Sequence, residues 1–325
     1  MCGITGYIGN KEALQIAFNN LRKLEYRGYD SAGVVYFAAG KSKPEAIVVR
    51  KTGKLHMLEG AIFGRKSEIG TAAIAHTRWA THGAPTEANA HPHADCGKKI
   101  FVVHNGIIEN YRELKEALVG SGHCFRSETD TEVVAHLIEE EMKFAANFDG
   151  AMEIALGKIT GAYAFGIIHS AEPDAIYFAR LGSPLVLGIG DGEYFLASDP
   201  TALAGLVKKV VYLKDGQRGK ITPKGFWVSP TRAKVEVLDL EIEQAQKGNF
   251  PHFMLKEIFE GAEVVEAAMR GRLLEKEGRV RLGGLSLVEE KIRKIKRLEI
   301  IACGTSYYAG LLGKLYFEEF ANLPK

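Results

Sequence analysis

Short apolar segments of strand length follow one another along the first 240 residues of this 325-residue chain. They lie at residues 3–8, 33–39, 45–50, 74–83, 100–106, 162–169, 175–180, 185–189, 194–197, 210–213, 218–222 and 235–238, and the fourth runs on into a loop. Turn-forming residues separate them, and only a few stretches have the 3.6-residue period of a helix. This pattern predicts a domain in which helices cover layered sheets.

The helical stretches have recognisable ends. Residues 11–26 carry apolar side chains on one helical face, and Gly28 ends the element. The segment from Thr129 to Glu132 matches a capping box, which predicts a helix running to about Met142. A further helical stretch follows Asn105-Gly106, where we expect the preceding strand to stop.

The composition changes after residue 240, where strand signals give way to a charged linker. Residues 252–277 have the pattern of one helix or of a broken pair. An apolar strand at 298–302 then leads through Cys303-Gly-Thr-Ser306 into a helix from Tyr307 to Phe320. A single strand–loop–helix unit cannot bury both faces of its strand, so we expect this part to belong to a larger fold.

Charge and cysteine content disfavour several classes of protein. The net charge is +2, from 42 basic and 40 acidic side chains, so nothing indicates a nucleic-acid or membrane surface. No apolar run is long enough to span a bilayer, and the first residues lack the features of a signal peptide. Cys2, Cys96, Cys124 and Cys303 include no CxxC pair and suit neither a disulfide framework nor a zinc site. We therefore expect a cytoplasmic protein without nucleic-acid or membrane partners.

Cys2 is the first candidate for chemistry, because removal of Met1 would make it the N-terminal residue. An α-amine has a pKa of about 7.7–8.0 and a thiol one of about 8.5. The amine can therefore accept the thiol proton at neutral pH, and no histidine is needed. The alternative is that Cys2 is a small buried apolar residue.

The segment His76-Thr-Arg-Trp-Ala-Thr-His-Gly83 carries groups that suit a carboxylate. Arg78 has a planar fork that can bind both carboxylate oxygens, and Thr81 and His82 stand beside it. The alternative for Arg78 is an ion pair with a surface acid. A tryptophan lies in the core more often than it has a functional role, so we expect Trp79 to be a core residue.

Two further groups suit an amide substrate. Asn105 and the backbone N–H of Gly106 would supply two donors to a developing oxyanion, unless Asn-Gly forms a hairpin turn. The helical character of the following residues disfavours the hairpin. Asp130 would hold an ammonium group, or serve only as an acid in the first turn of a helix.

Two remaining patterns are weaker. His91-Pro-His93 with Cys96 would supply three metal ligands, but no fourth is evident, so we expect no metal and no cofactor. Cys303-Gly-Thr-Ser306 brings small and hydroxyl residues to a helix N-terminus, where a phosphate binds readily. An ordinary tight turn between strand and helix is the alternative.

Six motifs occur in one order along the chain, namely Met1-Cys-Gly-Ile4, Glu25-Tyr-Arg-Gly-Tyr-Asp-Ser-Ala-Gly33, His76-Thr-Arg-Trp-Ala-Thr-His-Gly83, Asn89-Ala-His-Pro-His93, His104-Asn-Gly-Ile-Ile-Glu-Asn110 and Ser127-Glu-Thr-Asp-Thr-Glu132. Together they resemble the glutamine–fructose-6-phosphate aminotransferases (isomerising), over essentially all 325 residues. The resemblance implies an α+β fold at residues 2–240, a class II glutamine amidotransferase domain with the four-layer αββα sandwich of N-terminal-nucleophile hydrolases. It also implies a linker with helices at 241–284 and the incomplete start of an α/β sugar isomerase (SIS) domain at 285–325.

The resemblance assigns roles to matching positions in the glutamine site. Cys2 resembles the nucleophile, and Asn105 with Gly106 resembles the oxyanion hole. Asp130, together with the Gly106 carbonyl, resembles the site for the glutamine ammonium group. The loop that binds the glutamine carboxylate is represented by Arg78, Thr81 and His82.

Other matching positions have supporting roles in the family. Arg27 lies in the motif that braces the surroundings of the nucleophile, and Trp79 matches the gate of an ammonia tunnel. His91 also matches a position of a family motif, and we expect it to be a supporting residue. Thr305 and Ser306 would contribute to a sugar-phosphate site.

The chain departs from the family in two respects. Glu260-Gly261-Ala262 stands where the family usually has Gln-Pro, which affects local helix geometry. The family's second sugar domain and its isomerising residues have no counterpart, so we expect a fragment or truncated form with glutaminase activity only. In the full enzyme, a homodimer, ammonia would pass to fructose 6-phosphate and give glucosamine 6-phosphate and glutamate.

Two rival interpretations remain. Asparagine synthetases and purine-pathway phosphoribosyl amidotransferases also begin with Met-Cys-Gly-Ile, but Cys303-Gly-Thr-Ser306 argues against both. A catalytically silent module that senses sugar phosphates is the alternative from another class. The presence of Cys2, Arg78, Asn105 and Asp130 argues against that loss of activity.

Overall fold

The structure is a computed structural model that describes residues 2–37, 45–63, 70–238, 250–269, 272–274, 278–280, 289–292 and 294–321. The chain divides into two compact units, residues 1–248 and 249–325, and we describe each by itself.

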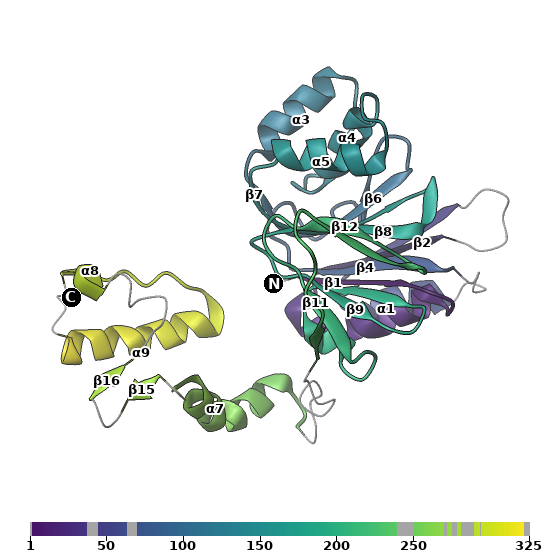
Figure 1. Cartoon of the computed structure of the whole chain (residues 1–325). Coiled ribbons are helices and arrows are strands. Elements are labelled where there is room, and N and C mark those ends of the chain that lie inside the picture. The colour runs from purple at the N-terminus through teal and green to yellow at the C-terminus, as the bar shows by residue number, and fades with distance from the viewer. Residues whose placement is uncertain are drawn as a thin grey trace. The chain divides into compact units, whose positions relative to one another are not determined.

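The first unit consists of two sheets covered by helices (Figure 1). Its strands are β1 (Gly3–Ile8), β2 (Ser31–Phe37), β3 (Ala46–Thr52), β4 (Ala72–Arg78), β5 (His93–Ala94), β6 (Ile100–Ile108), β7 (Gly161–His169), β8 (Glu172–Leu181), β9 (Val186–Ile189), β10 (Tyr194–Ala197), β11 (Lys209–Tyr212), β12 (Arg218–Thr222), β13 (Gly225–Ser229) and β14 (Glu236–Val237). Its helices are α1 (Ala13–Arg22), α2 (Leu55–Phe63), α3 (Tyr111–Gly120), α4 (Glu132–Glu141) and α5 (Phe148–Lys158), with short 3-10 helices η1 (Glu25–Arg27) and η2 (Pro200–Leu203).

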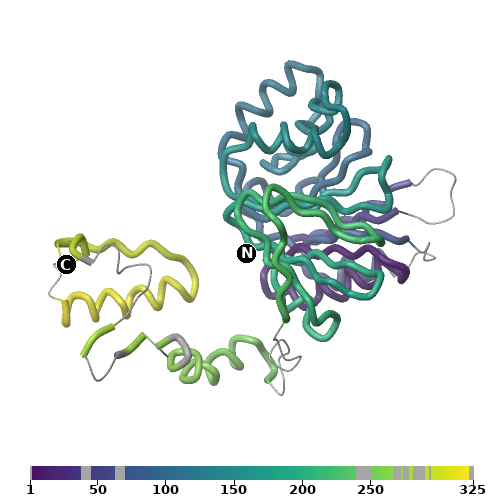
Figure 2. The backbone as a smooth tube through the Cα atoms, viewed as in Figure 1, coloured from purple at the N-terminus to yellow at the C-terminus, as the bar shows by residue number. Residues whose placement is uncertain are grey.

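The two sheets bring together segments that lie far apart in the sequence. The larger sheet has the strand order β14-β11-β9-β10-β1-β4-β2-β3, and the smaller one β13-β12-β8-β7-β6-β5. The N-terminal strand β1 lies between β10 and β4, antiparallel to both. Figure 2 shows this early, purple part of the chain within the same layer as the later green strands. The start of the chain is therefore held inside the larger sheet.

Three apolar clusters hold four layers together. One packs α1 and α2 on the larger sheet, with Tyr7 and Phe18 among its members. A second fills the space between the sheets and includes Ile4 and Phe178. The third, which includes Phe148, packs α3, α4 and α5 on the smaller sheet. Ile4 and Tyr7 face different clusters because side chains alternate along a strand. The expected αββα sandwich is confirmed (Figure 1).

Several local expectations for the first unit are corrected. β6 does not stop at Asn105-Gly106 but continues to Ile108, antiparallel to β7. Gly106 has a φ of +140°, and a Cβ at this position would lie 1.9 Å from the Ala162 carbonyl oxygen. Only glycine keeps β6 paired here. Helices α2 and α5 and strand β13 were not predicted, and residues 38–44 of the predicted turn region lie outside the described residues.

The predicted capping box at Thr129 is also wrong. The Glu132 carboxylate accepts hydrogen bonds from the backbone of Arg126 and Ser127 and from the Ser127 hydroxyl. The Thr129 hydroxyl lies 3.0 Å from His93 Nε2. The residues of this motif therefore order the loop before α4 and connect it to β5.

The second unit has little sheet structure. It contains α7 (Phe253–Met269), β15 (Leu273–Leu274), β16 (Arg279–Val280), α8 (Glu289–Ile292) and α9 (Gly304–Phe320). Of the stretch 252–277, predicted as one helix or a broken pair, α7 occupies the part up to Met269, and β15 pairs with β16 antiparallel beyond it. Glu260-Gly261-Ala262 lies within α7, which continues through these residues.

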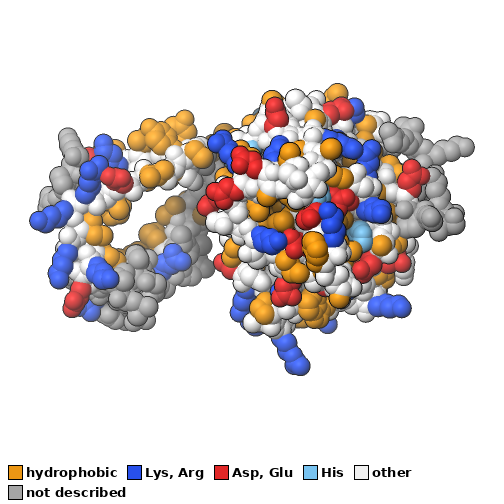
Figure 3. All heavy atoms as spheres, turned by 90° about the horizontal axis from the view of Figure 1, so that it is seen from above, with side chains coloured by type: hydrophobic (Ala, Val, Ile, Leu, Met, Phe, Trp, Pro, Cys, Tyr) orange, Lys and Arg blue, Asp and Glu red, His pale blue; other side chains and the backbone are white. Residues whose placement is uncertain are grey.

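The strand predicted at 298–302 is not formed. A strand requires a neighbour to bond its backbone groups, and no described residue of this unit pairs with the segment. α9 begins at Gly304, three residues before the predicted start. Apolar side chains of α9, such as Tyr308 and Phe320, are exposed, and Figure 3 shows apolar side chains at the surface of this unit. Among the described helices, none combines the length and apolar content that crossing a bilayer demands.

Candidate active site

Cys2 lies directly before β1 and is half-buried against the end of β4. The backbone N–H of Trp79 donates to Cys2 Sγ at 3.3 Å. Burial raises the pKa of the Cys2 thiol, and the Trp79 hydrogen bond and the charges of Arg78 and Arg27 oppose this shift in part. The thiol therefore needs a proton acceptor to react at neutral pH.

Asn105 contacts the backbone of the same cysteine from the smaller sheet. Its side-chain Nδ2 donates to the Cys2 carbonyl oxygen at 3.0 Å. The side-chain Oδ1 lies 3.1 Å from His76 Nε2, which also lies 3.0 Å from the His104 carbonyl oxygen. Because both of these oxygens are acceptors, the hydrogen of the neutral imidazole is on Nε2. Two facing strands, β4 and β6, thus hold the Asn105 amide toward Cys2.

A cluster of four buried histidines surrounds this contact. His76 stacks on His91 with ring centroids 4.1 Å apart, and His91 meets His93 edge-on at 4.7 Å. His91 Nδ1 accepts a hydrogen bond from the backbone N–H of His104. Burial lowers the pKa of all four imidazoles, to about 3 for His76 and His93. The cluster is therefore neutral at physiological pH.

Arg78, the last residue of β4, is buried and turns its guanidinium into the loop that follows. It donates to the carbonyl oxygens of His82, Gly83 and Ala84. Burial lowers the pKa of the guanidinium, and the charges of Asp130 and Asp30 oppose this shift. Arg78 therefore orders the 82–84 loop through these bonds. Its guanidinium is also close enough to Asp130 for the two charges to interact.

Asp130 lies in the loop before α4 and is buried. Its Oδ2 accepts the backbone N–H of Ile108 at 2.8 Å, which ties it to the same strand as Asn105. The neighbouring Thr131 hydroxyl lies 2.9 Å from His104 Nδ1. The histidine cluster thus connects the loop that carries Asp130 with the strand that carries Asn105.

The remaining matched residues of the first unit lie around this centre. Arg27 is buried and pairs with Asp199 at 2.5 Å. Trp79 is about half-exposed, and its ring centroid lies 5.7 Å from that of Tyr29, so the expected core position is wrong. The ring of His82 lies 5.6 Å from that of Tyr111.

The other predicted site residues are exposed. Thr81 is exposed on the loop after β4. Thr305 and Ser306 are exposed in the first turn of α9, which belongs to the second unit.

Sequence reasoning assigned no role to His76, His104, Thr131 and Asp199. The first three residues occur in the quoted motifs, so the sequence contained a signal for them. Their function is to hold strands and loops together, and it depends on which strands pack against each other. Asp199 lies outside every quoted motif and reaches Arg27 across 172 positions of sequence.

The sequence of this chain is similar to those of known amidotransferases. The family model described as a glutamine amidotransferase domain matches residues 76–205. A glutamine–fructose-6-phosphate aminotransferase (isomerizing) from Chlorobaculum tepidum is 46% identical, and the match covers 100% of this chain and 53% of the relative. A relative of the same name from Thermus thermophilus is 47% identical, with 100% and 52% covered. The chain spans about half the length of these curated relatives.

Solved structures of other proteins have a similar fold. The glutamine phosphoribosylpyrophosphate amidotransferase from B. subtilis, complexed with ADP and GMP, has a TM-score of 0.59 at 28% identity and covers 70% of this chain and 49% of its own. An allosteric regulatory enzyme of purine biosynthesis gives 0.59 at 27% identity, with 74% and 50% covered. The chain therefore contains a glutamine amidotransferase domain with the fold of the N-terminal-nucleophile type, and over its whole length it matches the N-terminal half of the glutamine–fructose-6-phosphate aminotransferases.

Proposed function

We propose that Cys2 attacks the side-chain amide carbon of glutamine and displaces ammonia. The product is a thioester, which water hydrolyses to glutamate and the free thiol. The observation that carries this proposal is the contact between the Asn105 amide and the Cys2 backbone, 3.0 Å long. It supports the proposal because the oxyanion of a tetrahedral intermediate formed at Cys2 would need an amide donor close by. Gly106, the next residue of β6, contributes its backbone N–H to the same oxyanion.

Removal of Met1 activates the nucleophile in this proposal. With Met1 attached, burial raises the pKa of the Cys2 thiol, and the residue has no basic group of its own. Loss of Met1 gives Cys2 a free α-amine with a pKa of about 7.7–8.0, close enough to the thiol to accept its proton. His76 does not substitute for this amine, because its Nε2–H already holds Asn105.

Recognition of glutamine as an amino acid rests on two opposite charges. Arg78 binds the α-carboxylate, with Thr81 and His82 on the same loop. A guanidinium has five N–H donors, so its three bonds to loop carbonyls leave donors for a ligand. Asp130, with the Gly106 carbonyl, binds the α-ammonium group. Arg27, paired with Asp199, and His91, stacked on His76, support the positions of these groups.

The relatives' names supply the second half of the reaction. In a longer protein of this kind, ammonia from Cys2 passes to fructose 6-phosphate and yields glucosamine 6-phosphate, with Trp79 as the gate between the sites. Residues 2–240 then form the amidotransferase domain, 241–284 a linker with helices, and 285–325 the start of a sugar isomerase domain. Thr305 and Ser306 contribute to its phosphate site. The exposed apolar side chains of α9 support this assignment, because a complete domain would cover them. We also propose that the longer protein is a cytoplasmic homodimer.

Glutamate release from glutamine tests the glutaminase step directly. The wild-type chain is compared with Cys2→Ala and with Cys124→Ser, which removes an exposed thiol. We expect Cys2→Ala to abolish release with an unchanged circular dichroism spectrum, and Cys124→Ser to retain it. Intact-mass measurement should show that active protein has lost Met1. Glutamate release at a near wild-type rate by Cys2→Ala, or by protein that retains Met1, would refute the mechanism.

A further inference from the structure

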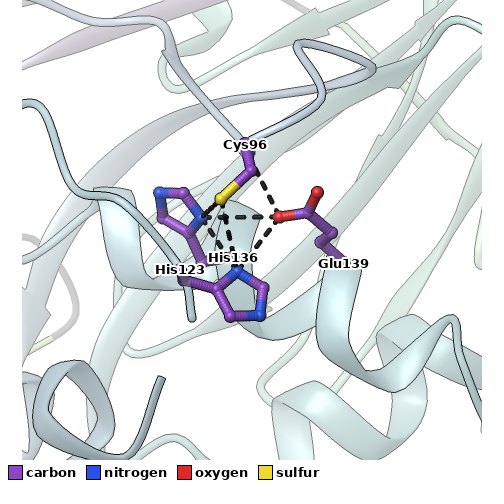
Figure 4. A group of neighbouring side chains, drawn as sticks. All are labelled: Cys96, His123, His136 and Glu139. Atoms are coloured by element: carbon purple, nitrogen blue, oxygen red, sulfur yellow. Dashed lines mark hydrogen bonds and ion pairs between the residues drawn. The ribbon is translucent and has the colours of Figure 1, made fainter. Parts of the chain in front are cut away.

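Four side chains outside the candidate active site converge on one small volume (Figure 4). Cys96 follows β5, His123 follows α3, and His136 and Glu139 lie one turn apart on α4. One ligand atom from each residue, a sulfur, two imidazole nitrogens and a carboxylate oxygen, lies within 4.8 Å of all the others. Figure 4 shows all four side chains pointing toward a common centre.

Five of the six distances within this cluster are close to the edges of a tetrahedral metal site, and the sixth, from Cys96 Sγ to the Glu139 carboxylate, is within 4.8 Å. Zinc bonds of about 2.3 Å to sulfur and about 2.0–2.1 Å to nitrogen and oxygen place tetrahedral ligand atoms about 3.3–3.6 Å apart. Cys96 Sγ lies 3.6 Å from His123 Nδ1 and 3.4 Å from His136 Nδ1. The two Nδ1 atoms are 3.2 Å apart. Glu139 Oε2 lies 3.1 Å from His123 Nδ1 and 3.5 Å from His136 Nδ1.

The outer nitrogens of both imidazoles face carboxylates. His123 Nε2 lies 2.8 Å from Glu140 Oε2, and His136 Nε2 lies 3.6 Å from Glu132 Oε1. A carboxylate on the far side of a ring favours the hydrogen on that nitrogen and leaves a lone pair on the other. Both Nδ1 atoms then present lone pairs to each other and to the Glu139 carboxylate, with only the Cys96 thiol proton among them. A cation at the centre satisfies all four groups.

The ligands are also held in place from behind. The backbone N–H groups of Cys96 and Gly97 donate to the Glu139 carboxylate at 3.1 and 3.3 Å. The backbone N–H of Cys124 donates to Cys96 Sγ at 3.4 Å, a contact that stabilises a thiolate. His123 and His136 are buried, so their rings have few alternative orientations.

We propose that Cys96, His123, His136 and Glu139 bind one divalent transition-metal ion of the zinc class. A thiolate with two imidazoles disfavours the hard ions magnesium and calcium. Four protein ligands complete a tetrahedron and leave no position for substrate, so the ion has a structural role. It joins the loop after β5 and the loop after α3 to helix α4.

This site differs from the one that sequence spacing suggested and that we did not expect to bind metal. Cys96 does not join His91 and His93, which belong to the histidine cluster beside Asn105. Its partners lie 27 to 43 positions further along the chain. No short motif contains them, which is why the sequence alone did not group these residues.

Metal content and a cobalt spectrum test the proposal on the whole chain. The experiments use a Cys2→Ala background, which removes the thiol of the candidate active site. After removal of bound metal with a chelator, titration with zinc should give about one equivalent per chain. Cobalt(II) in the same site should show a thiolate charge-transfer band and the strong visible absorption of tetrahedral coordination. The chain with zinc should also unfold at a higher temperature than the chain with chelator.

Three further substitutions separate the ligand set from its surroundings. Cys96→Ser should abolish the charge-transfer band and weaken zinc binding by at least about 100-fold, and Glu140→Gln should weaken it by about 10- to 100-fold. Cys124→Ser is the control, because it removes a neighbouring exposed thiol outside the ligand set and should retain the band. A different explanation of the cluster is a protonated imidazole between Glu139 and Glu140. It predicts no metal uptake and no band in any variant, and that result would overturn the proposal. Equal zinc affinity in Cys96→Ser and Cys124→Ser would do so as well.

Discussion

His76 Nε2 lies 3.1 Å from Asn105 Oδ1, and this contact determines which way the Asn105 amide faces. The opposite end of that amide donates to the Cys2 carbonyl oxygen. Rotation of the amide by half a turn would bring Oδ1 toward that carbonyl and Nδ2 toward His76. Both new contacts would be unfavourable, because His76 Nε2 is a donor. His76 is therefore a positioning residue for the proposed oxyanion donor.

His76→Leu should lower kcat for glutamine hydrolysis by at least about tenfold and leave KM nearly unchanged. Loss of an oxyanion donor costs roughly 10²–10³-fold, and a freely rotating Asn105 amide loses part of that effect. His76→Gln, which can still donate to Asn105 Oδ1, should recover part of the rate. Steady-state kinetics of both variants check this, with circular dichroism as the control for folding. A His76→Leu rate equal to the wild-type rate would show that another group orients Asn105.

Arg78→Lys should raise the KM for glutamine strongly, because lysine lacks the planar fork. The loss is about 2–5 kcal/mol if the carboxylate is fully desolvated in the complex. Arg50→Lys is a matched control, since Arg50 also donates to carbonyl oxygens of a loop, those of Ala88 and Ala90. Measured KM values should separate the two variants. Similar KM values for both would place the carboxylate site elsewhere.

Asp130→Asn tests the proposed ammonium site with little change in shape. The asparagine oxygen can still accept the Ile108 backbone N–H, so the loop before α4 should keep its conformation. The lost charge should raise the KM for glutamine, again by about 2–5 kcal/mol in binding. Glutaric acid monoamide, which has no ammonium group, is a useful probe. As a weak competitive inhibitor, it should bind the wild-type and Asp130→Asn proteins with similar affinity, and a large difference would contradict the assignment.

The four buried histidines should make the fold less stable in mild acid. Burial lowers the pKa of His76 and His93 to about 3, whereas an unfolded histidine titrates near 6.5. Below about pH 6.5 the unfolded chain binds protons that the folded chain does not, so the free energy of unfolding falls as pH falls. Each such histidine contributes a slope of about 1.4 kcal/mol per pH unit.

Urea unfolding between about pH 7.5 and pH 5 measures this slope, above the range in which most carboxylates titrate. His93→Gln should reduce the slope. His56→Gln, at an exposed position, should leave it unchanged. A free energy of unfolding that stays constant over this range would show that the histidines titrate normally in the folded protein.

The positions of individual strands were largely predictable. Segments such as 194–197 and 218–222 became β10 and β12 without change, because their apolar patterns are local. The prediction of a strand at 298–302 was wrong, because formation of a strand depends on a partner strand as well as on its own residues. β6 ran past Asn105-Gly106 because β7 supplies hydrogen bonds beyond the point where local turn signals predicted an end.

The sequence by itself determined the chemistry available to this protein. Cys2 next to Met1, the fork of Arg78, the amide of Asn105 and the carboxylate of Asp130 are properties of residue type and order. The tertiary structure decided which of these groups meet and in what protonation state. Donation from His76 to Asn105 and the convergence of Cys96, His123, His136 and Glu139 require strands and helices from distant parts of the chain to pack together. The physical reason is that distances and desolvation depend on packing, and these fix hydrogen-bond direction, pKa and metal geometry.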